Sequence, residues 1–189
     1  MKYKLSINDV AVKQLESAIW MYAYGYDEVA VHTIAGAAFE LYTKRLKLID
    51  FKSSMLAVLK PDKYKEFIDL WNRPYNFFKH GEFKKTPIDE FIYEEETVEM
   101  LIYFASEANL LGADEYQLKC SQIFKAYFII NHPEMIDAEI YKGVYEKNAE
   151  QAGLSIEKLK TKESLRTMLN ISGHTFVNGT NTPYTDLKK

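Results

Sequence analysis

The stretch VAVHTIAGAA, residues 29–38, decides the fold. Its apolar side chains surround most of the circumference of a helix, so we expect a central, buried helix that Asp27 caps and that runs to about residue 48. Gly36 lies inside this element, where glycine costs roughly 1 kcal/mol of helix propensity relative to alanine. That cost indicates close packing against a neighbouring element. His32 and Thr33 are polar, and each needs a hydrogen-bond partner if it is buried.

Further amphipathic segments lie on both sides of this helix. An apolar residue recurs every three or four positions in them, and glycine or proline residues separate several of them. The sequence contains no repeat and no convincing alternation of apolar and polar residues, so we predict an all-α protein. The other expected helices cover residues 8–24, 51–60, 62–71, 94–111, 114–131, 138–151 and 158–169.

The expected domain organisation is a helical bundle at residues 1–131 followed by an appended C-terminal part at residues 132–189. Residues 8–131 carry the clearest apolar periodicity, and we expect them to hold the core. Residues 138–169 predict more polar helices. From Ile171 the chain is rich in Ser, Gly, Thr, Asn and Pro, which is typical of a loose tail.

Composition and charge exclude several classes of function. The net charge is −3 and the isoelectric point is about 5.9, so no global basic field attracts nucleic acid, and any such contact must be local. Cys120 is the single cysteine, which excludes an internal disulfide and a multi-cysteine zinc site. No run approaches 18 consecutive apolar residues, so we expect a cytoplasmic protein with no membrane partner. No Walker, GxGxxG, GxSxG, HExxH or EF-hand motif is present, and we expect neither a cofactor nor a metal.

The stretch NRPYNFFKHG, residues 72–81, carries the candidate site. In a helix, Asn72, Asn76 and His80 fall at positions i, i+4 and i+8. Arg73 lies two turns from His80, so the four side chains share one broad stripe. Pro74 disfavours a continuous helix here. Either the helix kinks, or it stops near Asn72 and a new helix begins with proline in its first turn.

An arginine and a histidine on one stripe are suited to phosphodiester chemistry. Histidine accepts and returns a proton near neutral pH, and arginine holds a phosphate through two parallel hydrogen bonds. A metal-free ribonuclease needs a base near the 2′-hydroxyl, an acid at the leaving oxygen and donors to the other phosphate oxygens. Arg73 and His80 can equally form a hydrogen-bonded patch on an ordinary helix.

Asn76 and Lys79 extend the same candidate site. Asn76 either orients the histidine or holds a phosphate oxygen, whereas its structural role would be to satisfy backbone groups that Pro74 frees. Lys79 either adds positive charge for a phosphate or is simply solvated. His32 is either a core residue with its hydrogen bonds satisfied or, if it faces this stripe, a second proton-transfer group or a metal ligand.

Two stretches together, Tyr26–Ala38 and Asn76–His80, resemble a group of uncharacterised bacterial helical proteins that is similar to the HEPN superfamily. The resemblance covers about residues 8–131 and implies an all-α bundle, usually a homodimer. Many members of that superfamily are metal-independent ribonucleases in toxin, antiphage or RNA-processing systems. Their motif is an arginine followed, after four to six residues, by a histidine at a shared dimer cleft. Arg73 and His80 match it with six residues between them.

Two positions depart from the patterns of these groups. Pro74 follows the arginine, where the nuclease motif has a polar residue, often asparagine. Gly81 and Glu82 follow the histidine, where the uncharacterised group has an Ala-Asp pair. Some HEPN relatives are non-catalytic partners of nucleotidyltransferases, so the resemblance also implies a second class of function.

The leading hypothesis from the sequence is a metal-independent endoribonuclease or RNA-binding protein of a toxin or defence system. The alternative is a non-catalytic interaction module, or the dimeric partner of a nucleotidyltransferase or antitoxin encoded nearby. A homodimer is expected in both. The candidate catalytic residues are His80, Arg73 and His32, and the candidate substrate-binding residues are Asn76, Lys79 and Asn72.

Overall fold

The computed structural model describes residues 4–45, 73–83, 86–87, 96–112, 119–135, 156–172, 176–177 and 180–181. The described part is mostly helical, which confirms the all-α class. The expected helices at residues 51–60, 62–71 and 138–151 lie outside the described residues. Among the helices that the structure describes, none is long and apolar enough to cross a bilayer.

The first two helices begin where the sequence supplies capping residues. Helix α1 covers Ile7–Ala23, and Ser6 and Asp9 form a reciprocal capping box at its start. Helix α2 covers Glu28–Glu40, and the Asp27 carboxylate accepts a hydrogen bond from the amide of Ala30 at 3.0 Å. The π-helical turn η1, Leu41–Arg45, continues α2. The predicted starts of both helices are confirmed.

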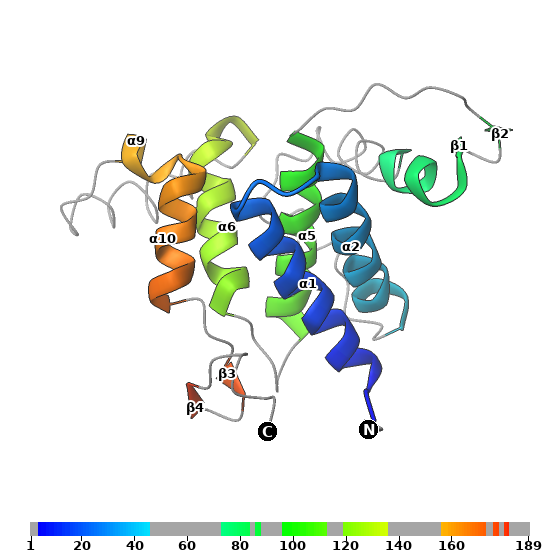
Figure 1. Ribbon diagram of the computed structural model, residues 1–189, viewed down its shortest axis with the longest axis horizontal. Helices are drawn as coiled ribbons and strands as arrows, with labels where there is room; N and C mark the ends of the chain where they lie inside the picture. The colour runs from blue at the N-terminus through cyan, green and yellow to red at the C-terminus, as the bar shows by residue number, and fades with distance from the viewer. Residues whose placement is uncertain are drawn as a thin grey trace.

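The bundle also contains α5, α6, α9 and α10, and Figure 1 shows it as a set of neighbouring helices. Helix α5 covers Glu96–Gly112, α6 covers Lys119–Asn131, α9 covers Ile156–Leu159 and α10 covers Lys162–Ser172. Helix α5 packs against α1, α2 and α6, and α10 packs against α6 and α1. A single helix was expected at residues 158–169, but the hydroxyl of Thr161 caps Ser164 and starts α10 as a separate helix.

The most enclosed helix in the described part of the chain is α5, whereas the sequence predicted that α2 would be central. All residues from Leu101 to Asn109 are buried, while α2 keeps Val29 exposed and several other side chains half-buried. Two polar residues of α5 have partners: Asn109 donates to the Tyr42 hydroxyl at 3.2 Å, and Glu107 lies 2.6 Å from Lys125. Polar residues in α5 therefore do not mark an exposed face.

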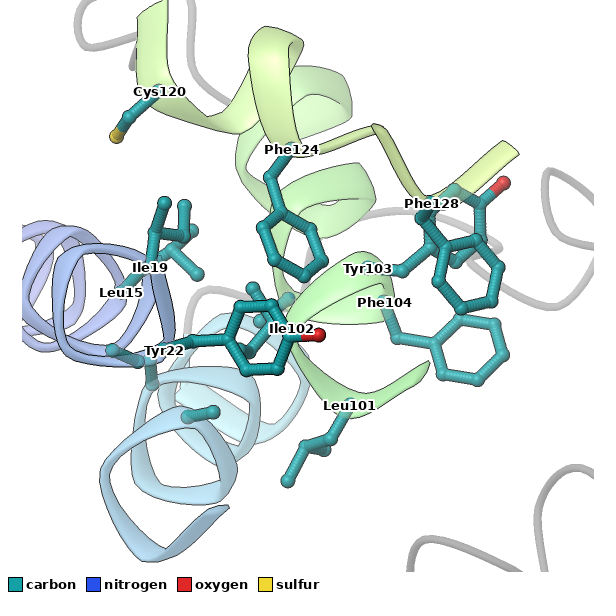
Figure 2. Packing of buried hydrophobic residues seen from close by; sticks show 14 of the residues in the cluster. Leu15, Ile19, Tyr22, Leu101, Ile102, Tyr103, Phe104, Cys120, Phe124 and Phe128 are labelled. Atoms are coloured by element: carbon teal, nitrogen blue, oxygen red, sulfur yellow. The ribbon is translucent and has the colours of Figure 1, made fainter. Parts of the chain in front are cut away.

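The core extends beyond residue 131, which corrects the expectation that it ends there. Leu165 and Leu169 of α10 are fully buried in the same cluster as the side chains of α1, α5 and α6. Figure 2 shows the aromatic part of this cluster, where Tyr22, Phe124 and Phe128 lie among rings and aliphatic side chains from other helices. Helix α10 is thus part of the bundle, because its two leucines cover apolar surface of α6 and α1.

A polar cluster joins three helices at one end of the bundle. The Tyr22 hydroxyl of α1 donates to one carboxylate oxygen of Glu99 in α5. The other oxygen of Glu99 lies 2.6 Å from Nε2 of His132, just after α6. The second ring nitrogen of His132 lies 3.6 Å from Glu134. Because its groups are mostly buried, this cluster holds α1, α5 and α6 in one relative position.

Two short antiparallel pairs are the described β-structure, and the sequence predicted neither. Strands β1, Glu82–Phe83, and β2, Thr86–Pro87, form the first pair. Strands β3, Phe176–Val177, and β4, Thr180–Asn181, form the second inside the expected tail. Each strand has only two residues, which is too short for an alternating pattern to be visible in the sequence.

Candidate functional site

Residues 73–80 form a helix that lies beside α2 and directly precedes β1 (Figure 1). Its side chains divide into two sides, as the helical turn of 100° per residue requires. Pro74 is buried, and Tyr75 and Phe78 are half-buried on the side that contacts α2. Arg73 and His80 are exposed and lie on the other side. Gly81 ends the helix with a φ of 67° and donates to the carbonyl of Phe77 at 2.7 Å.

The side that contacts α2 is anchored by two aromatic rings. The Tyr75 ring lies directly over Gly36, where a methyl group would overlap with the ring carbons. The Phe78 ring meets the His32 ring edge-on, with 5.3 Å between centroids and an interplanar angle of 86°. The sequence predicted close packing at Gly36, and this contact confirms it.

His32 is completely enclosed, with 0% of its surface exposed. Burial disfavours the charged imidazole and lowers its pKa to about 4, so His32 is neutral at pH 7. The sequence placed His32 in the site on the condition that it faces the stripe of Arg73, Asn76 and His80. The structure does not bring them together, because His32 lies under Phe78 while Arg73 and His80 are exposed. His32 therefore behaves as a core residue and is not part of the exposed site.

Lys79 is engaged with two neighbours. Its ammonium lies 3.1 Å from Oε2 of Glu40 and 3.3 Å from the Tyr75 hydroxyl. The same Glu40 oxygen accepts a hydrogen bond from the Tyr75 hydroxyl at 2.7 Å. The hydrogen bond to Glu40 raises the pKa of Lys79, and burial raises the pKa of Tyr75. The cluster of Glu40, Tyr75 and Lys79 is thus a charge-balanced group between α2 and the 73–80 helix. Lys79 was predicted to bind substrate, and here its charge is shared with Glu40.

A groove of about 690 Å³ lies between α1, α2 and the 73–80 helix. Each of the three elements contributes side chains spaced four residues apart, which line one side of a helix. The described lining residues are Val10 and Gln14 of α1, Thr33, Ala37 and Glu40 of α2, Leu41, and Tyr75 and Lys79 of the 73–80 helix. Its volume falls in the range of roughly 300–1,000 Å³ that small-molecule pockets occupy.

The exposed stripe contains three of the predicted site residues. Arg73 and His80 are exposed, and Asn76 between them is half-buried. The rise along the helix from Arg73 to His80 is about 10 Å, which is two turns. Asn72 lies outside the described residues. The exposed site is therefore Arg73, Asn76 and His80.

Sequence reasoning missed Glu40 and Tyr75. The sequence shows that Tyr75 and Lys79 are four residues apart, as are Gly36 and Glu40. Each pair therefore shares one side of its own helix. Nothing in the sequence paired the two helices at that register. Across the described ranges, no group of three His, Cys, Asp or Glu side chains is placed to hold a metal ion.

Comparison with known proteins yields no relative: no family model matches the chain, and neither do curated proteins or solved structures.

Proposed function

We propose that this protein is a HEPN-like, metal-independent endoribonuclease that binds and cleaves RNA at the stripe of Arg73, Asn76 and His80. The observation that supports the proposal is the placement of Arg73 and His80 on one exposed side of a helix whose opposite side is anchored on α2. A helix held in this way presents both groups to a ligand at fixed spacing, which catalysis requires.

The proposed chemistry uses these groups in separate roles. His80 removes the proton of a ribose 2′-hydroxyl, whose oxygen then attacks the adjacent phosphorus. The bond to the 5′-oxygen breaks, that oxygen receives a proton, and the products are a 2′,3′-cyclic phosphate and a 5′-hydroxyl. Arg73 donates hydrogen bonds to the phosphate oxygens as negative charge develops on them. Asn76 orients the His80 imidazole through its amide.

The reaction needs an acid as well as a base, and one chain offers one exposed imidazole in this stripe. His32 is enclosed, and burial lowers its pKa to about 4, so it is uncharged at pH 7 and does not supply the second proton-transfer group. We propose that a second copy of the chain supplies it, with the two 73–80 helices facing each other across a two-fold axis. The shared cleft that the HEPN resemblance implies has this arrangement. Membership of a toxin or defence system is part of the same proposal.

The test is cleavage of a labelled single-stranded RNA in the presence of EDTA. His80→Ala and Arg73→Ala should each lower the single-turnover rate at least 100-fold, since each removes a group that acts in the transition state. Arg166→Ala is the matched control, because Arg166 lies on α10 and contacts Tyr24 rather than the stripe. Unchanged circular dichroism and melting separate a catalytic loss from unfolding. Equal rates for wild type and both stripe variants would refute the proposal.

A second candidate function is a non-catalytic interaction module whose stripe docks a protein partner. The pairing of Lys79 with Glu40 favours it, because a carboxylate then balances the charge of Lys79, and the 73–80 helix offers too little net positive charge for strong binding to RNA. Binding of a neighbouring gene product that is lost in Arg73→Ala, with no cleavage of RNA by wild type, would favour this module. Sedimentation equilibrium tests the dimer that both candidates share.

A further inference from the structure

The groove between α1, α2 and the 73–80 helix has the properties of a ligand site distinct from the stripe. It opens on the side of the 73–80 helix that carries Tyr75 and Lys79, while Arg73 and His80 lie on the other side. From Thr33 to Leu41, its length along α2 is about 12 Å, because each helical residue adds about 1.5 Å. A groove of this length and volume accommodates a small molecule rather than a helix.

The groove combines aliphatic surface with polar groups and has one charged end. Val10, Ala37 and Leu41 supply the aliphatic surface from two sides, and Gln14 and Thr33 are also among the lining residues. The charged end is the charge-balanced cluster, in which Glu40 and Lys79 are only partly covered, with 29% and 43% of their side chains exposed. A bound molecule can therefore reach a carboxylate and an ammonium at the same place while its body lies on the aliphatic surface.

The charge balance of that cluster limits the ligand. An anionic head group would be attracted by Lys79 but repelled by Glu40. A cationic head group would be attracted by Glu40 but repelled by Lys79. Both charges are already paired with each other and with the Tyr75 hydroxyl, so neither requires a counter-charge from outside. A neutral head that both accepts and donates hydrogen bonds suits the two charges at once.

We infer that this groove binds a neutral small molecule with an apolar body and a carboxamide-type head, whose oxygen accepts from Lys79 and whose N–H donates to Glu40. The apolar body packs on Val10, Ala37 and Leu41, which supplies most of the binding free energy. The inference goes beyond the ribonuclease proposal and does not depend on it, since no residue of the exposed stripe takes part.

The test uses three probes with one body and different head charges: 3-phenylpropanamide, 3-phenylpropanoate and 3-phenylpropylamine. Their affinities for the full chain at pH 7 are measured by titration calorimetry or ligand-observed NMR. The wild type should bind the amide at least tenfold more tightly than either charged probe. Absence of binding of the amide at a Kd below about 1 mM, or preference for a charged probe, would overturn the inference.

Single substitutions of Glu40 or Lys79 should then change which of the three probes binds most tightly. Glu40→Gln leaves the Lys79 charge uncompensated, so the carboxylate probe should become the tightest ligand, with at least a tenfold gain. Lys79→Met should make the amine the tightest. Glu163→Gln and Lys158→Met are matched controls on exposed positions of α10 and α9, and they should leave the order unchanged. An order that does not change in either cluster variant overturns the inference.

A separate variant tests the location without altering charge. Ala37→Trp fills the groove from α2, and it should abolish binding of all three probes. Circular dichroism and melting confirm that the variant is folded, and Ile171→Trp, at a highly exposed position of α10, is its control. Full binding by folded Ala37→Trp would show that the probes occupy another place and would overturn the assignment.

Discussion

The ring of Tyr75 lies directly against the backbone of Gly36, with no room for a methyl group between them. Gly36→Ala should therefore destabilise the protein by roughly 1–3 kcal/mol through overpacking, although alanine is the better helix former. Urea unfolding at pH 7 measures the change in the free energy of unfolding.

The effect should reverse when the ring is absent. In a Tyr75→Ala background, Gly36→Ala should stabilise by about 0.5–1 kcal/mol, because only the helix propensity remains. Destabilisation of the same size in both backgrounds would show that the contact does not set the requirement for glycine.

His32 should make the stability depend on pH. Its folded pKa of about 4 lies below the ordinary value of 6.5, so the unfolded chain binds the proton more readily. The stabilisation from a neutral His32 is fully present above about pH 6.5 and is lost as the pH falls towards 4. The loss should amount to about 3 kcal/mol, since each pKa unit corresponds to about 1.4 kcal/mol.

The control for this prediction is His32→Leu, which cannot titrate. Other groups also titrate between pH 7 and 4, so the quantity to compare is the stability difference between wild type and variant at each pH. Wild type should lose stability relative to His32→Leu as the pH falls. A difference that stays constant from pH 7 to pH 4 contradicts the assignment of a buried, neutral His32.

The cluster at one end of the bundle should show energetic coupling between Tyr22 and Glu99. A hydrogen bond from a hydroxyl to a charged, partly buried carboxylate contributes about 1.5–3 kcal/mol, so a double-mutant cycle with Tyr22→Phe and Glu99→Gln should give a coupling energy of about that size. Tyr24→Phe is the control, because its hydroxyl contacts exposed Asn170 at 3.3 Å and should change stability by less than about 0.5 kcal/mol.

Helix α10 should contribute to global stability. Leu169 is completely buried, so Leu169→Ala should cost about 2–5 kcal/mol. Ile171→Ala, where 72% of the residue is exposed, should change the free energy of unfolding by less than about 0.5 kcal/mol. Two equally small effects would mean that α10 is only loosely attached.

The sequence predicted the helices that have clear local signals. The capping residue Asp27 marked the start of α2, and Gly36 marked a close contact. The sequence predicted helix α5 but not how deeply it is buried, because Asn109 and Glu107 look like surface residues until their partners on other elements are known. The same limit applies to Leu165 and Leu169, whose short helix looks polar in isolation.

The candidate site was predictable only in part, for a similar reason. Local spacing correctly placed Arg73 and His80 on one side of a helix. It could not show which side faces α2, and the ring of Phe78 rather than the stripe covers His32. The pairing of Lys79 with Glu40 depends on the register between two helices, which no local pattern encodes.

The proposed RNA site is best tested by an NMR titration of the histidine imidazole signals with a 2′-O-methyl RNA, which binds but cannot be cleaved. The signal of His80, identified by its loss in His80→Asn, should shift on addition of RNA, and the shift should be lost in Arg73→Ala. The signal of buried His32 should stay in place. A His80 signal that does not move at saturating RNA would contradict the account.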